Sequence, residues 1–310
     1  MSIIERAADM LGSASQPQRK PVAGEGPETL GPGLIERAVS SDKQLSEAVV
    51  APGPARAIGR VSRTLKIDLG KLRQQRMITP DAERTPIAEN FRRIKRHILA
   101  NVANPRAGPG TNLVMITSSL PGNGKTFCTI NLAISIAMEM DRTVLLVDAD
   151  VAKPTITTAL GVKVAAEQGL MDVLLHPEID VADVICKTDI GKLGVLPAGT
   201  RHARATELLA SEAMRALLQE MAERYDDRII IFDSPPLLAA TEACVLASRM
   251  GQILVVVEAG KTTEAELKDA LSRIESSNVV GVLLNKGAAP GSGYGYGYGY
   301  GYGYGYGDSA

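Results

Sequence analysis

Short apolar runs alternate with longer amphipathic segments from residue 112 onward. The runs show little alternation with polar residues, which is typical of strands buried on both faces of a sheet. They occupy residues 112–117, 143–148, 193–197, 228–233, 252–258 and 279–285. Between them, helical segments are predicted over residues 127–140, 205–225 and 262–275. Strands that alternate with helices predict an α/β fold with a doubly wound, mostly parallel sheet.

The region before this pattern divides into a helix and a flexible arm. Residues 85–102 predict a helix, because apolar side chains recur there at helical spacing: Ile87, Phe91, Ile94 and Ile98. Residues 1–61 are rich in Pro, Gly, Ser and Ala, which favours a flexible N-terminal arm with short helices. Its opening, “SIIERAADML”, suits either a small docking helix or a frayed end. We therefore expect this arm, a folded domain over 62–290, and a disordered tail over 291–310.

Composition narrows the class of protein. The 310 residues are 45% hydrophobic, enough for one large core, and the net charge of −1 argues against binding of nucleic acid through overall charge. The three cysteines are far apart in the sequence, which supports neither a disulfide framework nor a metal cluster. No apolar run reaches the ~18 residues of a membrane-spanning helix, and the N-terminus lacks a signal-peptide core. These features lead us to expect a soluble, cytoplasmic protein.

The stretch “SSLPGNGKTF”, residues 118–127, lies between a predicted strand and a predicted helix. Gly122 and Gly124 allow the backbone to curl so that its N–H groups face a phosphate. Lys125 can reach the terminal phosphates, and the Thr126 hydroxyl can bind Mg²⁺. The consensus loop begins with glycine, and Ser119 stands there instead. We predict a nucleotide-binding phosphate loop rather than a structural turn, with these contact residues: Ser119, Pro121, Gly122, Asn123, Gly124, Lys125, Thr126 and Phe127.

Two further predicted strands end in aspartates. “VLLVDADVAKP” carries Asp148 and Asp150 at the carboxyl end of a central strand, where α/β sheets bind ligands. “IIIFDSPP” ends its strand in Asp233, in the manner of the aspartate that supports Mg²⁺ in P-loop proteins. These residues lead us to expect Mg·ATP as the ligand. Three carboxylates are more than one metal ion needs, so one of them is free to act as a base.

Taken together, these motifs resemble those of the bacterial tyrosine kinases, or BY-kinases. The phosphate loop, “VLLVDADVAKP”, “GVLPAGT…ATELLAS” and “IIIFDSPPLLAATEA” occur in that order ahead of a tyrosine-rich tail. The resemblance covers about residues 80–310, and is strongest to stand-alone cytoplasmic autokinases encoded with exosortase-type exopolysaccharide systems. It implies a P-loop NTPase fold of the deviant Walker type, like that of ParA and MinD. It also implies a protein-tyrosine kinase that uses ATP and Mg²⁺.

The resemblance implies roles for residues at the sheet edge. Asp148 would accept the proton of the tyrosine hydroxyl, in a catalytic set completed by Lys125 and Asp150. The residues expected at the metal ion are Thr126, Asp150 and Asp233. Lys153 and Asn285 would join the nucleotide site.

The resemblance also implies partners. Glu89, Arg92 and Lys95 match a helix motif linked to ring assembly, with lysine where the family has a second arginine. Lysine lacks the two-pronged donor geometry of arginine, unless Arg96 takes its place. Two other departures from the family are Ala152, in place of arginine, and Glu242, in place of aspartate. The expected partners are further copies of the chain, a tyrosine phosphatase and an activating membrane polysaccharide chain-length regulator, which would place the kinase at the inner face of the plasma membrane.

The tail places a tyrosine at every second position, separated by glycines. So much glycine leaves the backbone too free to hold a strand, and the absence of lysine and arginine argues against nucleic acid. In a tyrosine kinase these rings are the expected phosphoacceptors: Tyr294, Tyr296, Tyr298, Tyr300, Tyr302, Tyr304 and Tyr306. A flexible tail of this length spans roughly 25 Å, enough to reach the active site of an adjacent copy. We therefore expect autophosphorylation in trans that regulates exopolysaccharide synthesis or export.

The main alternative is a ParA- or MinD-like ATPase that acts as a positioning or assembly switch. Such ATPases carry a lysine near the start of the phosphate loop that reaches the nucleotide of the partner subunit. Leu120, Pro121 and Gly122 occupy those places here, so a charge that stabilises the transition state of hydrolysis is missing. A scaffold that only binds ATP would be expected to lack one or more of the three carboxylates, and all three are present. The sequence favours the kinase.

Overall fold

The computed structural model describes residues 63–287, apart from 82–84, 105–107, 163–167, 225–226 and 275–278. The chain divides into two compact units, Met1–Val61 and Ser62–Ala310. The first unit lies wholly outside the described residues, and so does the predicted tail. The flexible arm and the disordered tail therefore stay predictions, and the fold described here is that of the second unit.

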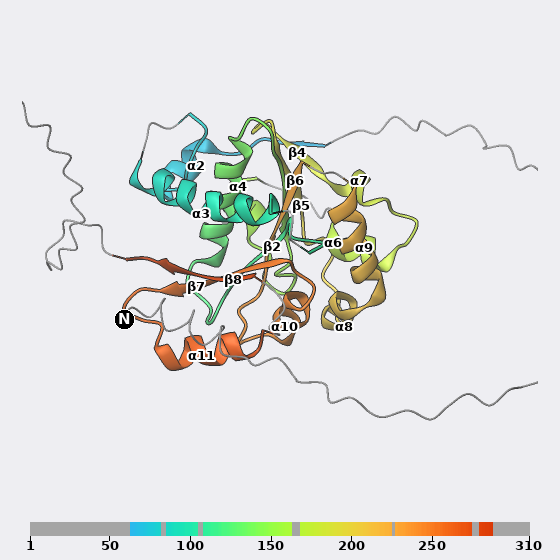
Figure 1. The fold of residues 1–310 in the computed structure, drawn as a ribbon. Helices are drawn as coiled ribbons and strands as arrows, with labels where there is room; N and C mark the ends of the chain where they lie inside the picture. The colour runs from blue at the N-terminus through green and yellow to red at the C-terminus, as the bar shows by residue number, and fades with distance from the viewer. Residues whose placement is uncertain are drawn as a thin grey trace, which may run out of the picture. The chain divides into compact units, whose positions relative to one another are not determined.

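A sheet of eight strands forms the centre of this unit (Figure 1). The strand order is β1-β4-β5-β3-β6-β2-β7-β8, and β4 with β5 is the antiparallel pair in an otherwise parallel sheet. The strands are β1 Thr64–Leu65, β2 Leu113–Ser118, β3 Thr143–Asp148, β4 Cys186–Thr188, β5 Leu193–Leu196, β6 Arg228–Asp233, β7 Gln252–Glu258 and β8 Val279–Asn285. The predicted α/β fold with a doubly wound, mostly parallel sheet is confirmed.

Two of the strands were not predicted from the sequence. β1 and β4 have only two and three residues, too few to form a recognisable apolar run. They extend the sheet beyond β5, where Thr64 pairs with Lys187. Their pairing depends on contacts between segments that are more than a hundred residues apart, which no local pattern records.

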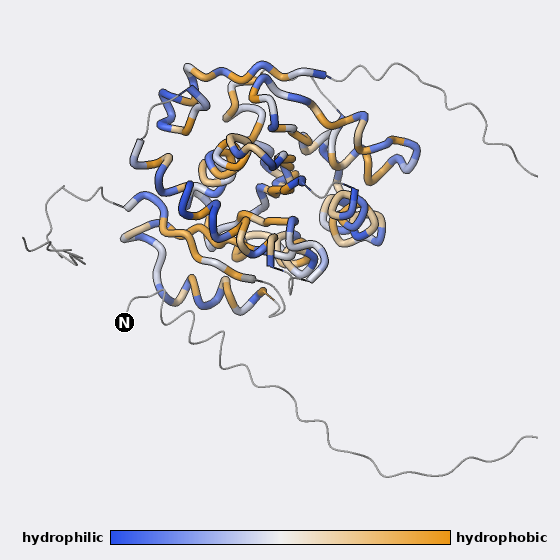
Figure 2. Tube along the Cα trace, turned by 45° about the horizontal axis from the view of Figure 1, so that its top comes forward, coloured by the Kyte–Doolittle hydropathy of each residue, from blue (hydrophilic) through white to orange (hydrophobic). Residues whose placement is uncertain are grey.

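Helices cover both faces of the sheet, and alternate residues of the central strands pack against them. On β2, Leu113 and Met115 belong to one hydrophobic cluster, while Val114 and Ile116 belong to the other. Figure 2 shows the hydrophobic colour concentrated along these inner strands. The helices on the second face are α2 Leu69–Gln74, α3 Pro86–Val102, α4 Lys125–Ala137 and α5 Ile156–Ala159. Those on the first are α6 Leu170–Leu175, α7 Val181–Val184, α8 Ala205–Ala210, α9 Glu212–Glu223, α10 Thr241–Ala247 and α11 Glu264–Ser272.

The segment 205–225, predicted as one helix, is two helices that meet at Ser211. The Ser211 hydroxyl accepts a hydrogen bond from the Met214 N–H at 3.2 Å and so caps α9, while its own backbone is extended. The serine hydroxyl thus satisfies the Met214 N–H, which in a continuous helix would bond to a backbone carbonyl one turn earlier. The chain therefore turns at Ser211. In the part of the chain that the structure describes, no helix combines the length and the apolar character needed to cross a bilayer.

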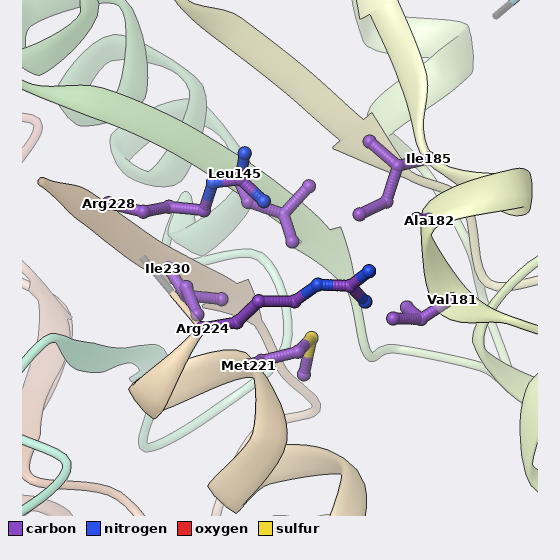
Figure 3. A pocket seen from close by; sticks show the side chains of 8 residues that line it. All are labelled: Leu145, Val181, Ala182, Ile185, Met221, Arg224, Arg228 and Ile230. Carbon is purple, nitrogen blue, oxygen red and sulfur yellow. The ribbon is translucent and has the colours of Figure 1, made fainter. Parts of the chain in front are cut away.

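A small cavity lies against β3 and β6 near the amino-terminal half of both strands (Figure 3). Its lining consists of Leu145, Val181, Ala182, Ile185, Met221, Arg224, Arg228 and Ile230. The Arg224 side chain extends across it and pairs with Asp180 at 3.3 Å and Glu220 at 3.0 Å. With a volume of about 20 Å³, it has room for about one water molecule and is too small for a nucleotide.

Candidate active site

Three parallel strands end side by side at the carboxyl edge of the sheet. β6 lies between β3 and β2, and Asp233 at its end is the register partner of Asp148 on β3 and of Ile116 on β2. The chain leaves β2 directly into the predicted phosphate loop, residues 118–127. This topology brings the loop and the aspartates to the edge where α/β sheets bind ligands.

Two glycines and an asparagine shape the phosphate loop. Gly122 and Gly124 have φ angles of 87° and 93°, in the left-handed region that favours glycine. The Asn123 side chain accepts the Leu120 N–H at 3.0 Å and donates to the Thr262 hydroxyl at 2.7 Å. Because α4 begins at Lys125, the N–H groups of its first turn have no partner within the helix. The loop is therefore a suitable site for a phosphate.

Lys125 stands among the carboxylates as their counter-charge. Its Nζ lies 2.7 Å from an oxygen of Asp150 and 3.7 Å from one of Asp233. Burial by itself would lower the pKa of Lys125, but the carboxylates, Asp233 foremost, outweigh it and raise the pKa. The Lys125 ammonium is thus charged, and it is held near the N-terminus of α4.

Asp233 is fully buried and receives hydrogen bonds from two hydroxyls of α4. Thr126 donates to it at 2.6 Å and Thr129 at 3.2 Å. Burial raises the pKa of Asp233, although Lys125 and both hydroxyls act in the opposite direction. The Thr126 hydroxyl also lies 3.0 Å from that of Thr155. These oxygens form a set of hard ligands of the kind that Mg²⁺ prefers.

Asp148 differs from the other two carboxylates because one of its oxygens has no partner. Oδ2 accepts the N–H groups of Thr155 and Ile156, each at 3.0 Å. Oδ1 is buried and makes no hydrogen bond within the described residues. Burial first, and the nearby charge of Asp233 second, raise the pKa of Asp148 to about 7. A carboxyl that titrates near neutral pH, with a free lone pair, has the properties of a general base.

The charges of the site favour a divalent cation. Among the described residues, the ammonium that pairs with this group of Asp148, Asp150 and Asp233 is that of Lys125, so full ionisation of the four side chains leaves an excess of two negative charges. No cluster of three histidine, cysteine or acidic side chains with the geometry of a metal centre occurs among the described residues. The carboxylate and hydroxyl oxygens are nevertheless of the kind that Mg²⁺ binds, because this ion commonly takes one or two carboxylates and completes its shell with substrate phosphates and water.

Several predicted nucleotide contacts lie around the loop in different ways. Ser119 is buried, and its hydroxyl has no hydrogen-bond partner within the described residues. Phe127 turns away from the loop and packs edge-on against Phe91 of α3, with ring centroids 6.5 Å apart. Lys153 is exposed, and its N–H donates to Asp150 at 3.2 Å. Pro121 is exposed, and Asn285 donates to the Asn123 carbonyl at 2.9 Å.

The residues expected to support assembly do not form one outward-facing group. Glu89 and Arg92 pair with each other at 3.1 Å on the surface of α3. Lys95 is buried: its ammonium donates to the Ser135 carbonyl at 3.0 Å and pairs with Glu139, so it ties α3 to α4. Arg96 is exposed. The tail tyrosines lie outside the described residues.

Two hydroxyls at the site were missed by the sequence reasoning. Thr129 follows Thr126 by three residues and therefore lies on the same face of a helix, a spacing that could have identified it. Thr155 touches Thr126 and donates its N–H to Asp148, but it lies beyond the aspartate motif in a stretch without regular periodicity. Glu242, by contrast, accepts the Thr206 hydroxyl at 2.7 Å and ties α10 to α8.

Known proteins are similar to this chain in sequence and in fold. A family model described as an AAA domain matches residues 111–278. The chain is 32% identical over 225 residues to the tyrosine-protein kinase YwqD of Bacillus subtilis. This match covers 71% of this chain and 90% of YwqD. The chain is also 34% identical over 176 residues to the tyrosine-protein kinase Etk of Escherichia coli. That match covers 56% of this chain and 23% of Etk.

A solved structure agrees with these matches. The kinase domain of the Escherichia coli tyrosine kinase Etk superposes with a TM-score of 0.55 at 26% identity, covering 76% of this chain and 94% of that domain. The similarity to YwqD extends over nearly the whole of that relative, whereas it reaches less than a quarter of full-length Etk. Together with the arrangement of loop and aspartates, these matches show that the chain belongs to the bacterial tyrosine-protein kinases, with the fold of P-loop ATPases.

Proposed function

We propose that this kinase uses Mg·ATP to phosphorylate the tyrosine cluster of its own C-terminal tail, in a neighbouring copy of the chain. The observation that carries the proposal is Asp148, a buried carboxyl with a free oxygen and a pKa of about 7 at the carboxyl edge of the sheet. A tyrosine hydroxyl must lose its proton as it attacks the γ-phosphorus, and a carboxylate with a free oxygen can accept that proton. A base that titrates near the working pH suits that step.

The transfer itself requires little covalent participation from the protein. A bond forms between the tyrosine oxygen and the γ-phosphorus while the bond from that phosphorus to the oxygen of ADP breaks. The hydroxyl proton passes to Oδ1 of Asp148, whose Oδ2 stays fixed by the N–H groups of Thr155 and Ile156. Lys125, now held by Asp150 and Asp233, would turn its ammonium to the terminal phosphates.

The donors of the site divide between nucleotide and metal. Thr126, Asp150 and Asp233 would hold Mg²⁺, which when bound offsets the charge of the phosphates. The loop from Ser119 to Phe127 would surround the phosphates with its N–H groups, and Lys153 and Asn285 lie at the same edge. Phe127 would contribute through its backbone, because its ring is packed on α3.

The tail supplies a substrate of suitable chemistry. Its seven tyrosines alternate with glycine from Tyr294 to Tyr306, and it contains no lysine or arginine. Glycine gives each ring the freedom to enter a site that is built on a rigid sheet. A span of roughly 25 Å favours transfer to a neighbour, and successive phosphates of about −1.5 to −2 charges each would drive the copies apart.

Partners follow from the family and from α3. Glu89 and Arg92 are available on the surface for contacts between copies, with Arg96 rather than Lys95 as the third member, because Lys95 is bound within its own subunit. A membrane polysaccharide chain-length regulator would activate the kinase at the inner face of the plasma membrane, and a tyrosine phosphatase would reverse it. The output would be control of exopolysaccharide synthesis or export.

Mixing two disabled chains tests transfer in trans. One chain carries Lys125→Met and an intact tail, and the other is active but ends after Ala289. Neither should become labelled alone with Mg·ATP, and mixing should place phosphate on the tail of the Lys125→Met chain, as read by mass spectrometry. The matched control for the acceptor is a Lys125→Met chain in which all seven tail tyrosines are also changed to phenylalanine. Phosphate on that control, or labelling of the Lys125→Met chain on its own, would contradict the proposal.

A further inference from the structure

Asn285, the last residue of β8, and Lys286 after it are hydrogen-bonded to two consecutive residues of the phosphate loop. Asn285 donates its amide to the Asn123 carbonyl at 2.9 Å, and the Lys286 ammonium donates to the Gly122 carbonyl at 2.8 Å. At the next loop residue, a Cβ placed on Gly124 would lie 2.2 Å from the Asn285 amide nitrogen. The two residues therefore cover the outside of the loop immediately before Lys125.

The backbone of Lys286 is held in an unfavourable conformation. Its φ is 58°, in the left-handed region, which a lysine adopts only where its surroundings determine it. This conformation follows the last residue of β8 and directs the side chain back to the loop. No part of the nucleotide motif requires a lysine here, so the strain points to a role for the ammonium.

The loop after β7 fixes the other side of this arrangement. Glu258 pairs with Lys286 at 3.2 Å, and its N–H donates to the Thr262 hydroxyl at 2.9 Å. The same hydroxyl accepts the amide of Asn123 at 2.7 Å. The ends of β7 and β8, which lie side by side in Figure 1, thus hold the loop from two directions.

We propose that Lys286 is a positioning residue for nucleotide binding, which with Asn285 keeps the phosphate loop in the conformation that accepts the phosphates. The proposal rests on the assignment of the loop to the nucleotide. Without the clamp, the free loop would spend part of its time in conformations that do not bind, and apparent affinity falls by the fraction that remains competent. Bound nucleotide restores the loop, so affinity should suffer while the rate at saturating ATP is kept.

Calorimetry with Mg·ADP on the full chain tests the clamp directly. Lys286→Met should weaken binding by about three- to tenfold, since the contact is half exposed and a charged hydrogen bond there is only moderately strong. Lys286→Gly should do the same, although glycine relieves the left-handed backbone, and it serves also if the methionine variant folds poorly. Lys286→Arg, which keeps the charge, should recover most of the affinity. In assays of tail phosphorylation the KM for ATP should rise and kcat should stay within about twofold.

Lys261→Met is the matched control. Lys261 also pairs with Glu258, at 3.4 Å, and is exposed at the same edge, but the described contacts do not join it to the phosphate loop. It should bind Mg·ADP like the unmodified chain. Unchanged affinity in both Lys286→Met and Lys286→Gly, or an equal loss in Lys261→Met, would overturn the clamp. Binding of Mg·ADP does not depend on phosphoryl transfer. If the Lys286 variants lose affinity as expected but the unmodified chain does not label its tail, the proposed function is refuted and the clamp stands. If the unmodified chain does not bind Mg·ADP, the proposed function and the clamp are both refuted.

Discussion

Asp148→Asn should stabilise the nucleotide-free chain at alkaline pH, although it should abolish phosphoryl transfer. Burial and the charge of Asp233 raise the pKa of Asp148 from its ordinary 3.8 to about 7. Between these values the folded chain holds a proton that the unfolded chain has released, so the free energy of unfolding falls as the pH rises. At ~1.4 kcal/mol for each tenfold change in proton affinity, the loss above pH 7 approaches ~4 kcal/mol.

Asparagine removes the charge and keeps the shape of the side chain. Its oxygen can accept the N–H groups of Thr155 and Ile156, as Oδ2 of Asp148 does now at 3.0 Å. Its NH₂ group takes the place of Oδ1, which has no partner within the described residues. The gain should therefore reach up to ~4 kcal/mol at pH 8 and fall below half of that at pH 5. At pH 5 the folded aspartate is already protonated, and only the ionisation of the unfolded chain remains.

Urea unfolding without nucleotide or Mg²⁺, at pH 5 and pH 8, measures both values. Asp172→Asn is the matched control with the opposite sign. Burial opposes ionisation of Asp172, but the N–H groups of Thr200 and Gly169, at 3.0 and 2.8 Å, outweigh it and lower its pKa. Losing that carboxylate should destabilise the chain at pH 8. If Asp148→Asn brings no gain at pH 8, or the same gain at both pH values, Asp148 is not a carboxyl held against its own ionisation.

Three further substitutions separate binding, loop geometry and packing. Asp233→Asn should weaken the binding of ATP analogues in the presence of Mg²⁺ far more than in its absence, which calorimetry would show; equal binding would remove Asp233 from the metal site. Gly124→Ala should lose nucleotide affinity because its φ is 93° and the new methyl group would meet Asn285, whereas affinity equal to that of the unmodified chain would mean that the loop adapts. Lys95→Met should lower the free energy of unfolding by about 1–2 kcal/mol, because the buried Ser135 carbonyl loses a charged donor; unchanged stability with altered assembly would return Lys95 to the subunit interface.

The parts of this fold that local sequence determines were predictable. β3 and β6 coincide with predicted strands and β2 is displaced from its prediction by one residue, because a strand buried on both faces needs consecutive apolar residues. The aspartates follow those runs directly, so strand order was not needed to place Asp148 and Asp233 at one edge. The phosphate loop was visible because its two glycines are needed for a left-handed backbone at Gly122 and Gly124.

What the sequence did not reveal depends on contacts between distant segments. In the sequence, Lys95 lies among charged residues of a predicted helix, a position typical of the surface. The packing of α4 against α3 is what brings its ammonium to the Ser135 carbonyl, forty residues away. Lys286 has no local pattern either, because its partner Gly122 is 164 positions away along the chain. Ser211 shows a different limit: two helices of similar composition were joined in the prediction, since one serine cap is a weak signal within a long amphipathic stretch.

The distribution of charge also makes the two ligands of the site dependent on each other. Lys125 now neutralises Asp150 at 2.7 Å and, less closely, the buried Asp233. A phosphate that draws this ammonium away leaves those carboxylates unpaired and adds negative charge beside them, which is costly in a site shielded from water. A cation that arrives with the phosphate removes both penalties, so each ligand should raise the affinity for the other by the same factor. The carboxylates that raise the pKa of Asp148 would thereby favour the magnesium complex of the nucleotide over the free nucleotide.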